Sequence, residues 1–351
     1  MTVRNDERAF RMADVARLAG VSVSTVSNVL NNRAIVSPEL TAKVRQAMRA
    51  IHFSPNRTAR GLRTGKTDIV GMVIPDVTNP FYAQILRGVE DTLTENGYEL
   101  MVCNSNRKPE LEQRHLNALH AQRVDGMILV PSNSYAAREI LLRNYPPLVF
   151  VDCLPFETKA NGVTIDNFAA AYEATKYLIE LGHQNIAVIS AELTYTSMSD
   201  RLEGYRKAMQ EAGIPLRAEY TVKSTTEVRG GYTGCRNLFS LDQPPTAIFS
   251  LNNRMALGAI QALQELKIAC PDQVSLLTFD DPEWATVVSP PLTAIEQPSH
   301  AIGVSAAKLL LKSIAARGKD GTQDSELIQL KSQLLVRGST GLVASIPRFH
   351  Q

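Results

Sequence analysis

Apolar residues follow two different spacings along the 351-residue chain, and the change comes near residue 67. Between Met12 and Ile51 they recur three or four positions apart, which is the spacing of one face of an α-helix. From Asp68 onward, short continuous apolar runs alternate with longer amphipathic stretches. This change predicts a small all-helical head followed by a body in which strands and helices alternate.

The first two helices of the head have the layout of a helix-turn-helix. The first apolar stripe consists of Met12, Val15, Ala16 and Ala19. Gly20 stands where a left-handed residue ends a helix, and Ser22 is placed to cap the next one. In this second helix Val26 and Leu30 turn inward, and the outward residues are Ser24, Thr25, Asn28 and Asn32. Such a polar face can read base edges in a DNA major groove; the alternative is a helix pair that only packs on its neighbours.

A third helix is well signalled. Ser37 is its predicted cap, Pro38 suits its first turn, and Glu39 lies at the positive end of its dipole. Its predicted buried stripe consists of Leu40, Val44, Ala47, Met48 and Ile51.

Residues 54–66 connect head and body, are basic, and contain one large apolar residue, Leu62. As an isolated helix this segment would be marginally stable. Two interpretations remain open: a plain linker, or a hinge helix that orders only on DNA and inserts Leu62 into a minor groove.

The pattern of the body predicts parallel sheets covered by helices on both faces, because strands alternate with helices. Strand-like runs lie at Ile69–Ile74, Glu99–Cys103, Gly126–Val130, Leu148–Val151, Ile186–Ser190, Tyr220–Lys223, Ala247–Ser250 and Val274–Phe279. Helical stretches lie at Pro80–Glu95, Leu111–Gln122, Phe168–Leu181, Asp200–Glu211, Tyr232–Leu241, Met255–Leu266 and His300–Ala316. We expect two such α/β halves with a cleft between them.

Charge is distributed unevenly between head and body. Residues 1–66 carry 12 Lys/Arg and 4 Asp/Glu, a net charge of +8, so −6 remains for the rest of a chain whose total is +2. A basic head on a mildly acidic body predicts a polyanion such as DNA as the partner of the head alone. Binding to a membrane surface is the competing interpretation, but no strongly hydrophobic helix face accompanies the charge.

Several classes of protein are disfavoured by missing motifs. The four cysteines form no CxxC pair, which argues against a zinc site and against a disulfide framework. No GxGxxG follows the first strand and no Walker motif is present, so we expect neither a nucleotide-dependent enzyme nor a cofactor. Without a signal segment or an apolar run long enough for a membrane, the chain is expected to be cytoplasmic, not a solute-binding protein that feeds a transporter.

Six stretches resemble the lactose/galactose repressor (LacI/GalR) family in their order and spacing. They are DVARLAGVSVSTVSNVLNN, SPNRTARGLRTGKT, VGMVIPDVTNPFYAQILRGVE, DRLEGYRKAM, NNRMALGAIQAL and LTAIEQP, which together extend over almost the whole chain. The resemblance implies a transcriptional repressor and not an enzyme. Such a protein binds a pseudo-palindromic DNA operator as a homodimer and a small carbohydrate-type effector between two lobes.

The resemblance also implies domain boundaries. A helix-turn-helix domain at 1–53 and a hinge at 54–66 precede an effector-binding and dimerisation body at 67–351, similar to periplasmic binding proteins. Lobe 1 would comprise 67–166 and 297–328, and lobe 2 would comprise 167–296 and 329–351. The chain would cross between lobes near Asn167, Glu296 and Ile328. The tail after Gly338 has no leucine heptads, so a dimer without a tetramerising coiled coil is expected.

For the head, the resemblance implies that Val23 and Ser24 begin the recognition helix and that Asn28 lies one turn further along. The family commonly has arginine where Asn28 stands, and arginine pairs with guanine whereas asparagine pairs with adenine. We therefore expect an unusual base opposite Asn28. The implied DNA contacts are Val23, Ser24, Thr25, Asn28, Arg33, Arg57, Arg60 and the intercalating Leu62.

For the body, the resemblance implies an effector site at the carboxyl ends of the strands, where open α/β sheets bind ligands. The candidates from lobe 1 are Asp76, Asn79, Phe81, Tyr82 and Asp152. The candidates from lobe 2 and a crossing are Arg201, Asn252, Asn253, Asp280, Trp284 and Gln297. Structural roles stay open for two of them, a salt bridge for Arg201 and a helix cap for Asp280.

Two candidate positions depart from common family usage. Asn253 replaces a frequent aspartate, which removes a negative charge near Arg201 and suits an anionic effector such as a sugar acid. Trp284, the only tryptophan, either stacks on a sugar face or is a core aromatic. Whether the effector is an inducer or a co-repressor is not decided by the sequence.

Overall fold

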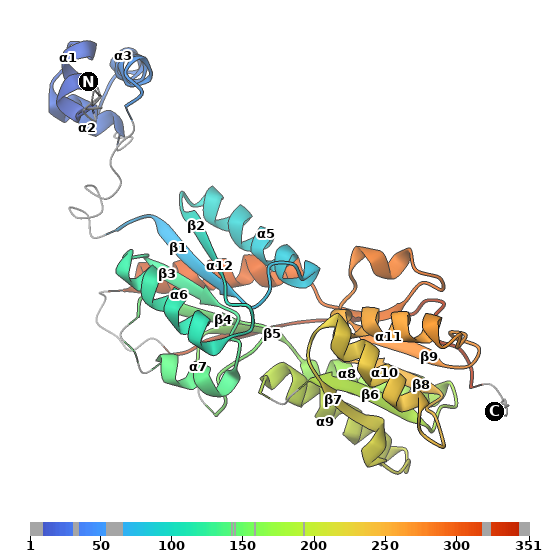
Figure 1. The fold of residues 1–351 in the computed structure, drawn as a ribbon. Helices are drawn as coiled ribbons and strands as arrows, with labels where there is room; N and C mark the ends of the chain where they lie inside the picture. Colours follow the sequence, from blue (N-terminus) through green and yellow to red (C-terminus); the bar gives the residue numbers. More distant parts are fainter. Residues whose placement is uncertain are drawn as a thin grey trace, which may run out of the picture. The chain divides into compact units, whose positions relative to one another are not determined.

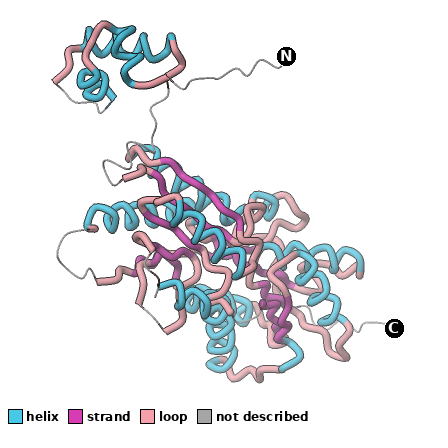
Figure 2. The backbone as a smooth tube through the Cα atoms, turned by 60° about the vertical axis from the view of Figure 1, so that its left-hand side comes forward, coloured by secondary structure: helices cyan, strands magenta, loops and turns pink. Residues whose placement is uncertain are grey.

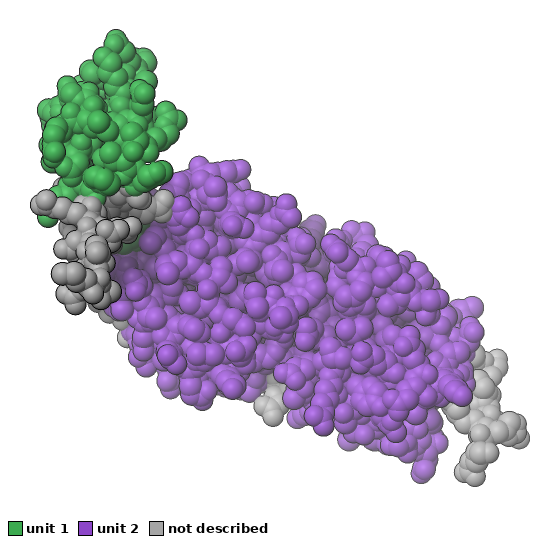
Figure 3. Space-filling view, turned by 45° about the horizontal axis from the view of Figure 1, so that its top comes forward, with its two compact units in different colours: residues 1–67 green, residues 68–351 purple. Residues whose placement is uncertain are grey.

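The computed structural model describes residues 10–30, 35–53, 66–141, 143, 145–157, 159–191, 194–317 and 324–343. Contacts divide the chain into two compact units, Met1–Thr67 and Asp68–Gln351, coloured green and purple in Figure 3. The first unit holds the helices of the head, and the second holds both sheets. Within the described ranges, no helix combines the length and the apolar character that a membrane span needs.

Serine caps and a glycine turn define the helices of the head (Figure 1). The described helices are α1 (Met12–Ala19), α2 (Val23–Leu30) and α3 (Pro38–Ala50). Gly20 ends α1 with a φ of 66°, a left-handed conformation that glycine adopts without strain. Ser22 Oγ accepts a hydrogen bond from Thr25 N at 3.1 Å, and Ser37 Oγ accepts one from Leu40 N at 3.3 Å. The predicted helix-turn-helix is confirmed.

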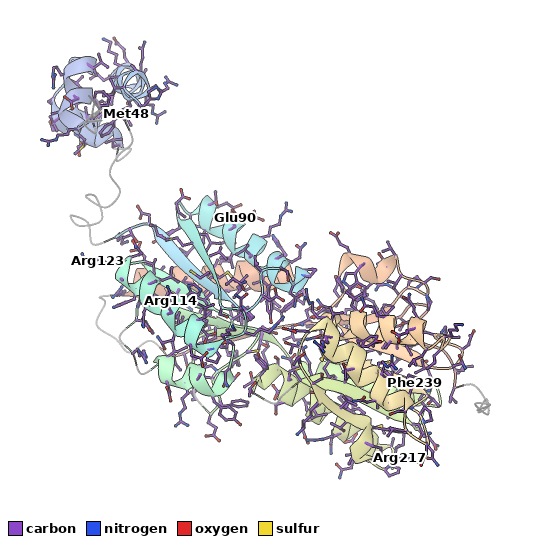
Figure 4. The ribbon with its side chains drawn as sticks, viewed as in Figure 1. Met48, Glu90, Arg114, Arg123, Arg217 and Phe239 are labelled. Carbon is purple, nitrogen blue, oxygen red and sulfur yellow. The ribbon has the colours of Figure 1, made fainter. Side chains whose placement is uncertain are left out.

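The core of the head draws on all three helices. Val15, Val26 and Val44 are fully buried against one another, and Met48, labelled in Figure 4, is half-buried beside them. The predicted stripe of α3 is wrong at Leu40, which is 36% exposed because it lies in the first turn, at the edge of the helix cluster.

Lobe 1 of the body is a parallel sheet between two layers of helices (Figure 1). Its strand order is β11-β5-β4-β3-β1-β2. The strands are β1 (Ile69–Ile74), β2 (Glu99–Asn104), β3 (Gly126–Leu129), β4 (Leu148–Val151), β5 (Gly162–Ile165) and β11 (Leu327–Leu330). The helices are α5 (Pro80–Glu95), α6 (Pro109–Ala121), α7 (Ser134–Leu141) and α12 (Ser299–Ala316). Side chains alternate along β1, so Met72 and Ile74 pack towards α5 and α12 whereas Val73 packs towards α6 and α7.

Lobe 2 repeats this plan with one antiparallel strand at its edge. Its order is β12-β10-β9-β8-β6-β7, in which only the pairing of β12 with β10 is antiparallel. The strands are β6 (Ile186–Ala191), β7 (Thr221–Ser224), β8 (Ala247–Ser250), β9 (Ser275–Phe279), β10 (Thr293–Glu296) and β12 (Gln333–Leu335). The helices are α8 (Asn167–Glu180), α9 (Thr196–Glu211), α10 (Val228–Phe239), α11 (Asn253–Glu265) and the short 3-10 helices η1 (Ala218–Tyr220) and η2 (Glu283–Thr286). Figure 2 shows the strands of both lobes enclosed by helices, and the predicted two-lobed α/β body is confirmed.

The chain crosses between the lobes between β5 and α8, between β10 and α12, and between β11 and β12. The predicted end of lobe 1 at residue 328 falls inside β11 (Leu327–Leu330) and is two residues too early. Ile328 pairs with Val163 in the sheet of lobe 1, and this pairing continues to Leu330, so the crossing follows Leu330.

Glycines allow neighbouring helices of each lobe to touch backbone to backbone. A Cβ at Gly88 of α5 or at Gly303 of α12 would lie 2.1 Å from a carbonyl oxygen of the facing helix. Gly231 of α10 and Gly258 of α11 have the same relation in lobe 2, where the separation would be 1.9 Å. Since real Cβ atoms do not approach backbone so closely, each lobe is a tightly joined body whose helices cannot shift independently.

We expect Gly303→Ala to lower the free energy of unfolding by roughly 1–3 kcal/mol, because α5 and α12 must move apart to accept the methyl group. Chemical unfolding followed by circular dichroism measures this loss. Ala315→Ser, which adds one atom at an exposed position of the same helix, is the matched control and should change stability little. Equal stability of the two variants would contradict the close helix contact.

Candidate functional site

A small cavity of about 30 Å³ lies between the two lobes, at the carboxyl ends of strands from both sheets. Its lining consists of Asn79, Phe81, Tyr82, Arg107, Asp152, Cys153, Tyr195, Ser197, Met198, Arg201, Thr226, Asn252, Asp280 and Gln297. Eight of the predicted effector residues are therefore brought together. Open α/β sheets bind ligands at the carboxyl ends of their strands, and the loops that follow the parallel strands of both lobes meet at this cavity.

Two aspartates occupy equivalent positions in the two lobes. Asp152 follows β4 and Asp280 follows β9, and both have a left-handed backbone, with φ of 65° and 67°. The amide of Asp152 donates to Val163 O at 3.1 Å, and that of Asp280 donates to Ile295 O at 3.0 Å. Each aspartate is thus held by the next strand of its own sheet, and each carboxylate lines the cavity.

Both carboxylates are almost fully buried, with relative exposures of 8% for Asp152 and 6% for Asp280. Burial raises the pKa of Asp152 to about 6; the charge of Arg201 opposes this shift and that of Asp280 adds to it. Burial also raises the pKa of Asp280, against the opposing effects of Arg201 and of hydrogen bonds from Gln297 and Asn253 N. The site therefore holds two carboxylates whose charges are costly in the folded protein.

Arg201 of α9 is held by partners from several elements. Its Nε donates to Asn167 Oδ1 at 2.8 Å and its Nη1 donates to Leu251 O at 2.7 Å. The guanidinium lies 3.9 Å from the centroid of the Phe279 ring, and its Nη2 is 3.9 Å from Asp152 Oδ1. Of the two roles considered for Arg201, the structural one is thus present, although the side chain also lines the cavity.

Three asparagines organise the ends of two helices that face each other across the lobes. Asn79 Oδ1 caps α5 by accepting from Phe81 N at 3.2 Å, and Asn252 Oδ1 caps α11 by accepting from Met255 N at 2.7 Å. Asn253 Nδ2 donates to Asn79 Oδ1 at 3.0 Å, which joins lobe 2 to lobe 1. Asn253 therefore makes a contact between the lobes and is not part of the cavity lining.

Two other predicted residues lie beside the cavity. The carboxylate of Asp76 accepts from Thr78 and, at 2.9 Å, from Arg107 Nη2, so it supports Arg107 and does not line the cavity. Trp284 lies in η2, half-buried, and lines a groove of about 870 Å³ that shares the Phe81, Asp280 and Gln297 wall with the cavity. Gln297 Nε2 donates to Asp280 Oδ1 at 2.7 Å within that wall.

The sequence does not predict several residues that line the cavity. They are Arg107, Cys153, Tyr195, Ser197, Met198 and Thr226. Arg107 follows β2, Tyr195 follows β6 and Thr226 follows β7, so the rule that selects Asp152 would have found these three as well. Burial raises the pKa of Tyr195 to about 12, hence its hydroxyl stays neutral.

In the head, the predicted recognition helix presents a polar surface. Val23 is 46% exposed, Ser24 is exposed, and Thr25 and Asn28 are half-buried. Ser22 Oγ lies 2.7 Å from Ser24 Oγ and 2.8 Å from Thr25 Oγ1, so the cap also orders this surface. The other predicted DNA contacts lie outside the described residues, namely Arg33, Arg57, Arg60 and Leu62.

Comparison with known protein families identifies the family to which the head and the body belong. A family described as "Periplasmic binding proteins and sugar binding domain of LacI family" matches residues 67–335, and one described as "Bacterial regulatory proteins, lacI family" matches residues 11–56. The chain belongs to the LacI family. It is a transcriptional repressor with a DNA-binding head and a body for a sugar-like effector, and not an enzyme.

Two LacI-family relatives cover nearly the whole chain. The ribose operon repressor of Escherichia coli (strain K12) is 38% identical over 330 residues, which are 93% of this chain and 99% of the relative. The HTH-type transcriptional repressor PurR of Histophilus somni (strain 2336) is 36% identical over 333 residues, 93% of this chain and 97% of the relative.

Solved structures of LacI-family proteins share the fold. The lac repressor dimer bound to operator and the anti-inducer ONPF has a TM-score of 0.83 at 25% identity and covers 95% of this chain and 100% of its own. The transcriptional regulator CelR in complex with cellobiose has a TM-score of 0.72 at 29% identity and covers 94% of this chain and 99% of its own. A LacI-family regulator from Enterococcus faecium with bound ribose has a TM-score of 0.69 at 29% identity, covering 79% and 100%.

Asp152→Asn tests the electrostatics of the cavity. The pKa of Asp152 is about 6 in the folded protein and about 3.8 when unperturbed, so the stability associated with its protonated form is present below pH 3.8 and is lost as pH rises through 6. Asparagine removes this dependence. We expect the free energy of unfolding of the variant, relative to wild type, to rise by on the order of 2–3 kcal/mol between about pH 4 and pH 7.5.

Denaturant unfolding in the absence of sugar, at several pH values, measures this difference. Asp242→Asn is the control, because it removes the same charge from an exposed loop. A difference between Asp152→Asn and wild type that stays constant over this pH range would rule out a raised pKa at Asp152.

Proposed function

We propose that the protein is a cytoplasmic, homodimeric repressor of a pseudo-palindromic operator, and that a small carbohydrate bound between the lobes controls its affinity for DNA. The observation that carries the proposal is the set of buried carboxylates and amides that both lobes contribute to one cavity. Sugar hydroxyls are donors as well as acceptors, and buried carboxylates such as Asp152 and Asp280 need donors. An apolar or purely cationic lining would not suit a polyol.

The size of the small cavity supports an effector that acts on lobe arrangement. Ligand sites typically measure roughly 300–1,000 Å³, whereas this cavity measures about 30 Å³. A sugar therefore needs the lobes to separate or their facing loops to turn. An effector that favours the lobe arrangement compatible with DNA acts as a co-repressor, and one that favours the other arrangement acts as an inducer.

Related regulators support a carbohydrate effector. Ribose and cellobiose are bound in two of them, which favours a carbohydrate of one or two rings.

Exposed apolar side chains support the homodimer. Met101 and Val102 are 41% and 42% exposed on the edge strand β2, where apolar surface suits a self-association contact. A two-fold dimer presents two recognition helices to two inverted half-sites.

The test measures operator binding by the full-length protein, with an operator selected from random DNA, in the presence of pentoses, hexoses, aldonates and purines. We expect a carbohydrate to change the dissociation constant for DNA. Asp280→Asn should weaken that response about tenfold, because a hydroxyl loses a charged acceptor, whereas Asp242→Asn should leave it unchanged. A response to a purine alone would refute the carbohydrate assignment.

Asn28→Arg tests the assignment of the recognition helix. We expect the preferred base opposite residue 28 to change from adenine to guanine, since arginine pairs with guanine O6 and N7 and asparagine pairs with adenine N6 and N7. Selection from half-sites randomised at each position measures the preference. Gln46→Arg adds the same charge at an exposed position of α3 and controls for general affinity. An unchanged base preference in Asn28→Arg would exclude this role of Asn28.

A further inference from the structure

A second cavity shares lining residues with the small one and differs from it in charge. It measures about 580 Å³ and is lined by Arg107, Ala191, Thr194, Tyr195, Lys223, Ser224, Thr225, Thr226 and Glu227. Three residues, Arg107, Tyr195 and Thr226, line both cavities. We call this second cavity the mouth; these three residues form the wall between it and the small cavity.

Two buried carboxylates, Asp152 and Asp280, and the guanidinium of Arg201 line the small cavity away from its shared wall. Its second cation, Arg107, lies in the wall shared with the mouth and is paired with Asp76. Arg201 is committed to the protein itself through Asn167 Oδ1, Leu251 O and the Phe279 ring. An anionic ligand group placed at this end would face two carboxylates.

The mouth has the opposite character. Arg107 and Lys223 are its cations, whereas Glu227 is its acid, at an exposed position before α10. Hydroxyl groups of Ser224 and Thr225 lie among them. Cations together with hydroxyl donors are the groups that bind carboxylate and phosphate oxygens.

Arg107 is held in place at the junction of the two cavities. Its amide donates to Pro75 O at 3.1 Å, and the neighbouring Ser105 N donates to Ile74 O at 2.8 Å, so the loop after β2 is tied to the end of β1. Arg107 Nη2 donates to Asp76 at 2.9 Å, and the side chain is only 17% exposed. A guanidinium fixed in this way is pre-organised for a ligand that reaches from one cavity to the other.

We propose that the effector is a sugar with a terminal anionic group, a carboxylate or a phosphate monoester, whose hydroxyls face Asp152 and Asp280 and whose anionic end lies in the mouth on Arg107 and Lys223. This inference rests on the proposed carbohydrate-controlled repressor and specifies its effector. The reverse orientation places the anion beside Asp152 and Asp280, where Arg201 is already bonded to the protein, and leaves Lys223 without an anionic partner from the ligand. The charge pattern of the two cavities therefore determines both the class of ligand and its direction.

Calorimetric titration of the full-length protein tests this proposal. The probes are a pentose and a hexose, each as the neutral sugar, the aldonate and the terminal phosphate, so that the carboxylate and the phosphate are distinguished. We expect one anionic form to bind about tenfold or more tightly than its neutral parent. Its affinity should fall as NaCl rises from about 50 mM to about 300 mM, whereas that of the neutral sugar should not.

Lys223→Gln provides the decisive variant, because Lys223 is exposed and its loss leaves the core intact. We expect the preference for the anionic form to fall about fivefold while the affinity for the neutral sugar changes less than about twofold. Lys308→Gln, at an exposed position of α12 in the other lobe, is the matched control and should leave the preference unchanged. Operator affinity without sugar verifies that both variants are folded.

The remaining outcomes overturn the proposal in distinguishable ways. If a neutral sugar binds as tightly as its anionic forms, or if Lys223→Gln weakens all forms equally, the anionic effector is refuted and the carbohydrate-controlled repressor stands. If none of the sugars binds while operator binding is intact, the carbohydrate effector itself is refuted and this inference falls with it.

Discussion

The buried guanidinium of Arg201 is the interaction on which the arrangement of the two lobes depends. It bonds to Asn167, the first residue of α8, immediately after the chain has crossed from lobe 1. Asn167 Nδ2 in turn donates to Thr164 Oγ1 and Ile165 O of β5. The same cation lowers the cost of burying carboxylates from both lobes. Removing it would take away the cation that stabilises the charged forms of two buried acids, so structure and ligand chemistry depend on the same group.

The contacts within each lobe differ in kind from those between the lobes. Within each lobe, glycines bring paired helices into backbone contact, which resists internal rearrangement. Between the lobes, single hydrogen bonds are made: Asn253 Nδ2 donates to Asn79 Oδ1, Arg254 Nη1 to Thr78 Oγ1, Leu154 N to Thr196 Oγ1 and Ser134 N to Thr194 O. Each such bond contributes only about 1 kcal/mol net. The helix ends that face each other across the junction are thus easier to separate than any helix is to displace from its own sheet.

The sequence predicts those features that depend on neighbours along the chain. α5 has its expected bounds, and the serine caps of α2 and α3 form as expected, because capping is a local interaction. The strands β5, β10, β11 and β12 are not predicted. β11 and β12 are edge strands whose residues are exposed or only partly buried, so they lack the continuous apolar run of an equally short buried strand such as β4 or β8. Asp152 and Asp280 can be predicted because each directly follows a strand, at the sheet edge where ligands bind. Asn253 and Trp284 line the neighbouring groove and not the cavity, and this depends on how the two lobes meet.

The contrast between cavity size and ligand size links recognition to movement. The lining of the small cavity comes from loops of both lobes, and its volume of about 30 Å³ admits about one water molecule. The glycine-mediated contacts leave little room for paired helices to shift within a lobe. Space for a sugar ring is therefore expected from the facing loops or from the junction, where the Asn79–Asn253 and Thr78–Arg254 bonds would break if the lobes turned about their crossings. A ligand that replaces those bonds with its own hydroxyls compensates for their loss, and so stabilises a lobe angle that the free protein adopts less often.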